Sequence, residues 1–325
     1  MNVFQKILIA PKLVACYAYD GWRFIRYAHL FDDPFCSQSC AQAHLYRLSH
    51  SLEKGLALPQ PRVGFGRELT EQVMKDLEKY YAKFGADSCT ADVRGILESL
   101  LESHEANGIS WEDISSRLSA LSYKGTEPNN SEQKTGLVER TRKEVLASLP
   151  ASPELFFKQR HSVRQFSGVQ IPRLEIERAV QLAQRAPSVC NRQGGRLHLY
   201  DEPTLKEKIL AHQDGNRGFG DQAAVIVAVT HDLSIFYKNG ERNQAFVDGG
   251  IFAMNLTMAL HALGYGSCML NWSMSPRQDV AMRKDIGIPE GEVIIALIAV
   301  GGLREKYTVA ASPRRPVESI ASWNK

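Results

Sequence analysis

The sequence lacks a strong excess of charge of either sign. Its 39 Lys and Arg residues against 36 Asp and Glu residues leave a formal charge of +3 over 325 residues. Proteins whose main partner is nucleic acid or an anionic membrane surface usually present a clearly basic face. We therefore predict that neither is the main partner of this chain.

Long hydrophobic runs are also missing. No stretch approaches the roughly 20 apolar residues that cross a bilayer, so we predict no transmembrane segment. The apolar residues among the first 20 are interrupted by Lys6, Pro11 and Lys12, which leaves no continuous core for a secretory signal. We expect a cytoplasmic protein. For residues 1–20 two interpretations stay open: a peripheral membrane contact, or an amphipathic helix or strand packed on the rest of the protein.

Cysteines are few, six in all, and scattered. A chain of this length does not need disulfides to fold, so we expect reduced thiols. Cys36 and Cys40 are spaced to share a helix face, but no cluster of Cys or His completes a metal site with them, and we predict no metal. Cys190 and Cys268 are interpreted as small buried thiols rather than redox-active groups.

Common catalytic signatures are absent too. The chain contains no P-loop, no H-E-x-x-H, no G-x-S-x-G and no Rossmann G-x-G-x-x-G. A nucleotide would therefore have to bind on another scaffold. We also find no convincing acid–base pair.

A polar stretch divides the chain. Residues 124–136 read KGTEPNNSEQKTG and hold no aliphatic or aromatic side chain, which is typical of a linker. Before it, apolar residues recur every three or four positions in 69–84, 93–101 and 111–121, so we predict helices there. The predicted organisation is a helical N-terminal extension (1–123), a linker (124–137) and a second domain (138–325).

Helices and strands alternate after the linker. Periodicity and punctuation by Pro and Gly predict helices over 138–149, 172–186, 204–211, 245–263 and 276–286, and strands over 196–200, 223–230 and 293–300. The helix over 245–263 is apolar nearly all round, which places it in a core or a subunit interface. The fold class is α+β with a central sheet flanked by helices.

Three segments could bind a ligand. In an extended 160–166 segment, Arg160, Ser162 and Arg164 point the same way and suit a phosphate and a polar ring edge. A solvated basic strand is the alternative. The loop 186–195 offers small polar groups, and 312–316 holds two arginines between prolines. An ordinary turn and a charged tail are the alternatives for these two.

Taken together, these segments resemble the nitroreductase family of FMN-dependent enzymes. The family's motifs R-x-S-x-[RK]-x-F and A-P-S-x-x-N-x-Q correspond to residues 160–166 and 186–193. Its long apolar helix corresponds to 247–263, and its G-x-G-S-type strand to 264–268. Its C-terminal arginine corresponds to Arg314. The resemblance covers about the last 175 residues. It implies a nitroreductase-like fold and a homodimer with FMN at the subunit interface.

The resemblance also implies roles for single residues. Arg160, Ser162 and Arg314 would hold the FMN phosphate, and Arg164 would stabilise negative charge at the flavin O2/N1 edge. The set expected around the cofactor is completed by these residues: His161, Pro187, Ser188, Asn191 and Gln193 (the loop residues from the partner subunit), Asn216 at the isoalloxazine edge, and the backbone amides of Asn271 and Trp272 near flavin N5.

The implied activity is a ping-pong hydride transfer from NADH or NADPH through flavin N5 to a small organic acceptor. The family loop usually continues Q-P-W, whereas Gly194 and Gly195 follow here, and Trp272 stands where glycine is common and would narrow the pocket. A specialised biosynthetic reductase or dehydrogenase acting on one metabolite, and a non-catalytic flavin-binding scaffold, stay open.

The N-terminal half has a phrase of its own. Residues 50–56 (HSLEKGL) and the Pro-rich stretch after them look like the helical extension of some nitroreductase-type proteins encoded with polysaccharide genes. A helix that ends at Gly55 before a Pro-rich turn accounts for most of the pattern. We keep open that His50, Glu53 and Lys54 reach over the flavin pocket.

Overall fold

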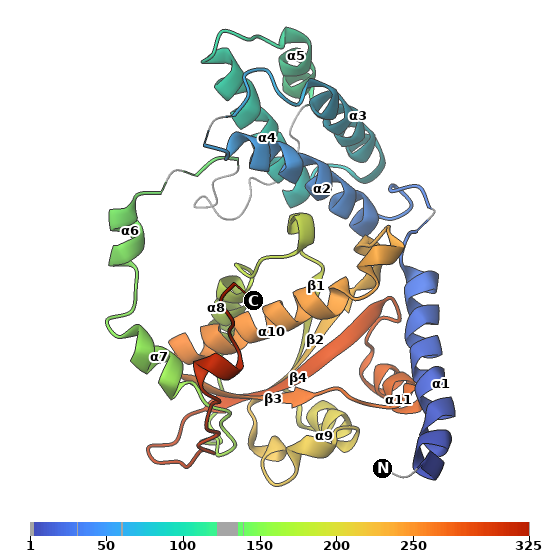
Figure 1. Cartoon of the computed structure of the whole chain (residues 1–325), viewed down its shortest axis with the longest axis vertical. Helices are drawn as coiled ribbons and strands as arrows, with labels where there is room; N and C mark the ends of the chain where they lie inside the picture. Colours follow the sequence, from blue (N-terminus) through green and yellow to red (C-terminus); the bar gives the residue numbers. More distant parts are fainter. Residues whose placement is uncertain (1–2, 31, 60, 122–135, 139, 325) are drawn as a thin grey trace.

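A four-stranded antiparallel sheet lies at the centre of the C-terminal half (Figure 1). The computed structural model describes residues 3–30, 32–59, 61–121, 136–138 and 140–324, with side chains from residue 11 onward. The strands are β1 (Gly195–Tyr200), β2 (Val225–Asp232), β3 (Tyr265–Asn271) and β4 (Glu292–Gly302). Their order is β1-β2-β4-β3, so β1 and β3 form opposite edges of the sheet.

Both faces of the sheet are buried. Side chains alternate along each strand, so one strand contributes residues to the cores on both faces. On β2, Ile226 and Ala228 belong to one apolar core, and Val225, Val227 and Val229 belong to another. Seven of the eight β2 residues are buried. The predicted doubly buried strand is thereby confirmed.

Two pairs of helices cover the two faces. The first core includes residues of α9 (Pro203–Ala211) and α11 (Pro276–Ile286). The second includes residues of α8 (Arg173–Ala183) and α10 (Gln244–Ala262). The chain is therefore α+β with a central sheet between helices.

The helix α10 is buried along one side only. Ala253, Leu256 and Leu260 lie in the core. Val247, Ile251 and Met254 on its other side are exposed in the single chain. The apolar circumference read from the sequence therefore leaves an apolar face that nothing in the described chain covers.

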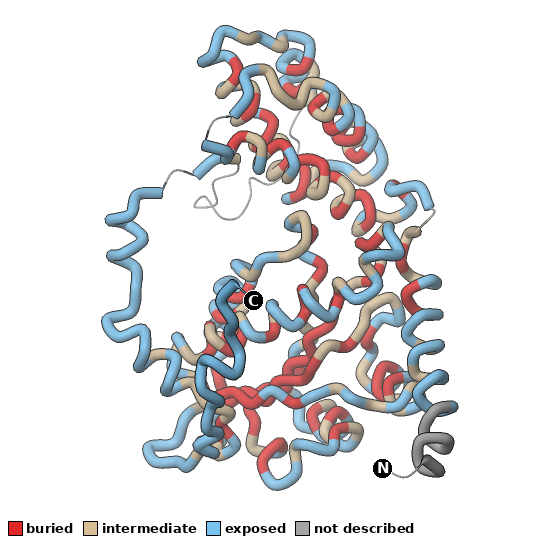
Figure 2. Tube along the Cα trace, in the orientation of Figure 1, coloured by how far each residue is buried: buried red, intermediate tan, exposed pale blue. Residues whose placement is uncertain are grey.

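The helices α2 to α5 build a separate core above the sheet (Figures 1 and 2). They are α2 (Gln38–Leu56), α3 (Arg67–Phe84), α4 (Ser88–Glu105) and α5 (Glu112–Ala120). Leu45, Leu77, Leu97 and Ile114 are fully buried among them. The predicted helical extension is confirmed by this group.

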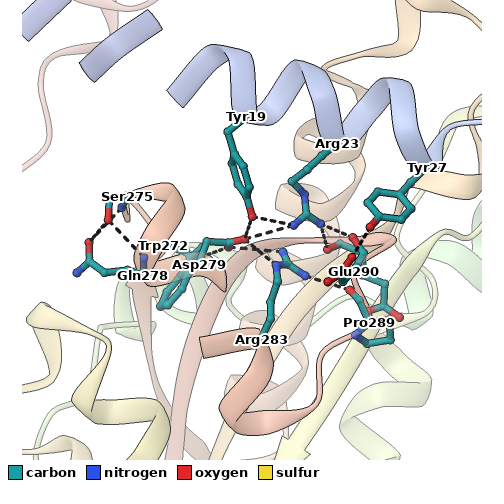
Figure 3. A network of polar contacts seen from close by, with 11 residues as sticks. Tyr19, Arg23, Tyr27, Trp272, Ser275, Gln278, Asp279, Arg283, Pro289 and Glu290 are labelled. Carbon is teal, nitrogen blue, oxygen red and sulfur yellow. Dashed lines mark hydrogen bonds and ion pairs between the residues drawn. The ribbon is translucent and has the colours of Figure 1, made fainter. Parts of the chain in front are cut away.

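The first helix, α1 (Val3–Tyr27), packs on the C-terminal half instead. Arg23 is buried and donates to the backbone oxygens of Glu290 (2.6 Å) and Glu292 (2.7 Å). Figure 3 shows Tyr19, Arg23 and Tyr27 on one face of α1, directed at α11 and the start of β4. Residues 3–20 are thus helical, and among the described residues no helix is long and apolar enough to cross a bilayer.

Between the two halves lie α6 (Arg142–Ala147) and α7 (Pro153–Gln159). The helix expected over 138–149 is shorter than predicted, because α6 has no buried residue and so no packed face to extend it. The sequence pattern did not predict α7. Most of the predicted linker (residues 124–135 of 124–137) lies outside the described residues, and the division into domains stays a prediction.

The remaining predicted elements agree with the structure within a few residues. The 3-10 turns are Val189–Asn191, Asp214–Asn216, Gly220–Gln222, Leu233–Ile235, Asn239–Glu241 and Val317–Ser319. One detail differs: Pro172 precedes α8 as its N-cap rather than forming its first helical residue.

Candidate functional site

The segment 160–166 runs beside the β3 edge of the sheet. The Val163 amide donates to the Ser267 carbonyl at 2.9 Å, and Ser162 forms an isolated bridge with Ser267. Gly266 permits this approach, because a Cβ there would lie 3.1 Å from Val163. Val163 and Phe166 are buried in the core, whereas Arg164 between them is exposed and Arg160 and Ser162 before them are half-buried.

This segment carries two guanidinium groups, Arg160 and Arg164. Neither Arg160 nor Arg164 makes an ion pair or side-chain hydrogen bond with any residue in the described ranges. Arg164 is exposed, with its guanidinium 5.8 Å from the Phe219 ring centroid. His161 is half-buried beside them. Unpaired cations next to a hydroxyl (Ser162) form the donor set that phosphate prefers.

The C-terminal end of β3 is joined to the turn 214–216. Gln213 donates to the backbone oxygen of Asn271 at 3.2 Å, and Asn216 donates to the Leu210 carbonyl at 2.8 Å. The amide of Asn216 also bonds the Gln213 carbonyl. These contacts bring Asn216 and Asn271 to one place, but they use the Asn216 amide within its own loop.

Trp272, the next residue, turns its indole toward α11. Its Nε1–H donates to Asp279 Oδ1 at 2.8 Å, and it lines a cavity of about 230 Å³ together with Tyr19 and Arg23 of α1. Burial raises the pKa of the Asp279 carboxyl, but its bond and ion pair with Arg283 (2.6 Å) outweigh burial, so the pKa is lowered overall. The indole therefore lies at the α1 contact, where it anchors the end of β3.

The loop 186–193 lies at the opposite edge, directly before β1. Cys190, Asn191 and Gln193 have φ values of 49°, 53° and 51°, a left-handed conformation that Asn tolerates better than most residues. Ser188 Oγ accepts from the Gln193 amide at 3.0 Å. Pro187, Asn191 and Gln193 are exposed. The loop thus holds a fixed shape with its predicted ligand residues outward.

Two buried charged residues that the sequence patterns missed hold this loop. Arg192 donates to the Ile235 carbonyl at 2.8 Å and pairs with Glu241, and Asp248 of α10 accepts from the Val189 amide at 3.0 Å. Burial raises the pKa of the Glu241 carboxyl, but the bond and charge of Arg192 and the bonds from the Tyr237 and Lys238 amides together outweigh burial, so the pKa is lowered overall. Arg192 is part of the loop motif, but its inward direction could not be read from the sequence.

Within one chain, the segment 160–166 and the loop 186–193 are not in contact. In the described ranges no hydrogen bond or ion pair joins the loop 186–193 to 160–166. They flank strands three positions apart, which is about 14 Å at the usual strand spacing. Arg314 is exposed in the C-terminal segment, where it bonds the Ser312 carbonyl. The C-terminal arginine that contacts the 160–166 segment is Arg304, which donates to the Phe166 carbonyl at 2.7 Å.

The helical half covers the loop 186–193. A cavity of about 420 Å³ lies between them, lined by Gln42 and Tyr46 of α2 and by Ser188 and Gln193. A second cavity, of about 310 Å³, is lined by His50, Glu53, Pro187, Asn191 and Gln193. His50 Nδ1 lies 2.9 Å from Glu53 Oε2. His50 and Glu53 therefore share a cavity with the loop, whereas Lys54 is absent from the lining of both.

Comparisons with known proteins identify the region that carries these groups. The model of the nitroreductase family matches residues 157–302. A protein of Archaeoglobus fulgidus named NADH dehydrogenase/NAD(P)H nitroreductase is 29% identical over 145 residues, which cover 44% of this chain and 80% of that protein. The CLA biosynthesis enone reductase of Lactiplantibacillus plantarum is 35% identical over 104 residues, covering 31% of this chain and 48% of the reductase, about half of its length.

Solved structures are similar to about half of the chain. A nitroreductase of Desulfovibrio desulfuricans in complex with FMN is 22% identical, with a TM-score of 0.46, and the match covers 54% of this chain and 99% of that one. An FMN-dependent nitroreductase of Clostridium difficile is 18% identical, with a TM-score of 0.45, over 52% of this chain and 98% of that one.

Proposed function

We propose, from the match of the nitroreductase family model to residues 157–302, that the protein is an FMN-dependent oxidoreductase that takes electrons from NADH or NADPH. The observation that carries this proposal is the unpaired cationic edge at 160–164. Arg160 and Arg164 lie on a segment held against β3, and no described residue neutralises either charge. A bound FMN would neutralise them, its phosphate at Arg160 and the negative charge of its reduced ring at Arg164.

The residues present fit FMN in chemistry as well as in order. The Arg160 guanidinium and the Ser162 hydroxyl suit its phosphate, and Arg164 suits an edge of the ring that gains negative charge. The Asn191 side chain and the Pro187 ring, held outward by a rigid loop, suit the polar and apolar parts of the ring system. When bound, FMN would supply hydride transfer at N5, in two half-reactions that share one face.

The proposed site requires a homodimer. The cationic edge and the loop 186–193 lie on opposite edges of one sheet, so an FMN that contacts both must draw the loop from a second copy. The exposed apolar side of α10 (Val247, Ile251, Met254) offers a surface for such a copy. Two symmetric sites would then form at one interface.

An absorbance spectrum of the purified chain tests the proposal. We expect flavin bands after reconstitution with FMN, and their bleaching when NADH or NADPH is added without oxygen. Flavin that binds but is not reduced by either nucleotide would favour the non-catalytic scaffold. A chain that binds no flavin would contradict the proposal.

A specific observation favours the narrower activity, a reductase or dehydrogenase for one metabolite. The helical half adds Tyr46, His50 and Glu53 to cavities that adjoin the loop 186–193. A substrate that reached the flavin from this side would contact α2. Generic acceptors would not need a contact with α2. Rapid turnover of unrelated quinones and nitroaromatics would argue against this narrower activity.

The role of α2 can be tested with one substitution. In Glu53→Gln the shape is kept and the charge beside His50 is lost, so KM for the physiological acceptor should change while FMN binding and reduction by the nucleotide stay the same. Glu98→Gln is the matched control: Glu98 also pairs with a neighbour one turn away on its helix (Arg94, 2.7 Å) but lines neither cavity.

A further inference from the structure

Three potential metal ligands meet where α1 gives way to α2. They are a ring nitrogen of His29, the Cys36 thiol and the Cys40 thiol, and their ligand atoms all lie within 4.8 Å of one another. Cys36 Sγ is 3.3 Å from His29 Nδ1 and 3.8 Å from Nε2. Spacing along the chain did not reveal this cluster, because His29 is seven residues before Cys36 and only the fold places the two side chains together.

We propose that His29, Cys36 and Cys40 form a site for a thiophilic divalent metal ion of the zinc type. Zinc binds thiolate at about 2.3 Å and imidazole at about 2.0–2.1 Å in tetrahedral geometry, which separates N from S by about 3.6 Å and S from S by about 3.8 Å. Asp32 lies against His29 Nδ1, which leaves Nε2 as the ligand nitrogen, and the 3.8 Å between Nε2 and Cys36 Sγ is close to that value. The cluster is therefore close to the size that the ion requires.

The backbone around the ligands is fixed by the fold. The His29 amide donates to the Phe236 carbonyl at 2.9 Å, and the Cys36 amide donates to the Asp33 carbonyl at 2.9 Å. Ser37 caps α2 by accepting from the Cys40 amide. Each ligand thus sits on a segment whose position is set by other bonds, so binding would need little rearrangement.

The surroundings also suit a metal-bound histidine. Asp32 Oδ2 lies 2.8 Å from His29 Nδ1, and a carboxylate that accepts from one ring nitrogen directs the other nitrogen to a metal. Cys40 Sγ lies 2.8 Å from Ser37 Oγ, a hydroxyl able to donate to a thiolate. Cys36 is exposed and Cys40 is buried, so the site opens to solvent on one side, where water would complete the coordination.

A disulfide between the two cysteines is the competing interpretation. It would explain the proximity of the sulfur atoms, but it would give the histidine–carboxylate pair no part. The metal site uses all of these groups and predicts that His29 matters as much as the cysteines.

The site would join the two halves of the protein. Cys40 Sγ contacts the Ser234 carbonyl at 3.3 Å, and His29 is bonded to the Phe236 backbone, so the ion would tie the start of α2 to the loop after β2. The same helix carries Tyr46 and His50 into the cavities over the loop 186–193. The ion would thereby stabilise the position of α2 over those cavities.

Cobalt(II) is a suitable probe, because tetrahedral cobalt bound to thiolate absorbs in the near ultraviolet and the visible. The full chain, purified without affinity tags and fully reduced, is stripped with a chelator and titrated with Co²⁺ before FMN is added. We expect thiolate–cobalt bands that saturate at one ion per chain and disappear when Zn²⁺ is added. The melting temperature should rise with the ion.

Cys36→Ser is the main variant, because the exposed position tolerates serine without loss of the fold, which circular dichroism checks. It and His29→Ala should bind Co²⁺ at least tenfold more weakly, and Cys190→Ser, at a cysteine outside the cluster, should match the parent. The proposal is overturned by absent thiolate bands in the reduced parent chain, or by bands that persist unchanged in Cys36→Ser and His29→Ala.

Discussion

The two edges of the sheet differ in whether their charged side chains have partners within the protein. At the β3 edge, Arg160 and Arg164 have no protein partner among the described residues. At the β1 edge, the charged groups point inward: Arg192 bonds Ile235 and pairs with Glu241, and Asp248 holds the Val189 amide. One edge keeps its charge available, and the other uses its charge to fix a loop.

This difference separates two contributions to a binding site. An edge with unpaired cations attracts an anionic ligand. Removing those cations should change the free energy of unfolding little. A loop fixed by buried ion pairs supplies shape, and losing those pairs costs folding free energy. The predictions that follow use substitutions that should affect one contribution without the other.

The largest effect is expected at the buried anchor of the β3 edge. Asp279→Ala leaves Arg23 and Arg283 buried without their carboxylate, which should lower the free energy of unfolding by about 3–5 kcal/mol. Urea unfolding measures it. Asp201→Ala removes a carboxylate from an exposed pair with Arg173 and should cost less than about 1 kcal/mol. Equal losses of free energy of unfolding in the two variants would mean that the Asp279 network does not anchor the β3 edge.

The next effect concerns ligand binding. Replacing Arg160 and Arg164 together with alanine should weaken FMN binding about 100-fold or more, because each charged hydrogen bond contributes roughly 1.5–3 kcal/mol. The melting temperature should stay close to that of the parent, since neither side chain forms an ion pair or hydrogen bond with a described residue. Fluorescence titration measures the affinity, and Arg178→Ala on α8 is the control. Unchanged affinity would remove the cationic edge from the proposed site.

Local signals in the sequence predicted much of the sheet domain. The helix over 276–286 has the predicted bounds because Pro276 starts it and Gly287, at φ 74°, ends it. The cationic segment and the loop were predicted from their motifs. What the sequence could not give depends on distant contacts: the packing of Arg23 on β4, the inward turn of Arg192 and the return of His29 to Cys36. None of these has a local pattern, since each joins segments that the fold alone brings together.

A third effect should appear as a dependence of stability on pH. His231 lies behind the loop, with no exposed side chain and with Nε2 3.9 Å from Asp248. Burial lowers its pKa, and Asp248 offsets this only in part. Between the two pKa values His231 therefore binds a proton in the unfolded chain and stays neutral in the folded chain. The stabilisation is complete above the unfolded pKa of about 6.5 and is lost as pH falls from there toward the lower folded value.

Urea unfolding across this pH range measures that loss. The free energy of unfolding should fall less steeply with acidification in His231→Phe, which keeps a ring stacked on Phe236, than in the parent. An identical slope in both proteins would show that other groups cause the acid sensitivity.

The smallest effect distinguishes shape from contact at the β1 edge. Asn191 has φ 53°, so Asn191→Gly should keep the loop, whereas Asn191→Ala should lose about 1 kcal/mol of stability. Both variants lack the amide and should bind FMN roughly 2- to 10-fold more weakly. Thermal melts and titrations on the pair measure the two quantities. A glycine variant that binds like the parent would mean that the Asn191 side chain does not contact FMN.

The strand order β1-β2-β4-β3 has a genetic consequence in the proposed homodimer. Each chain would contribute the cationic edge of one site and the loop of the other, so a substitution at either edge would damage both sites of a homodimer. Two inactive alleles altered at different edges should nevertheless complement each other when they are expressed in one cell. Random pairing would yield mixed dimers with one intact site each, and thus about a quarter of all sites restored.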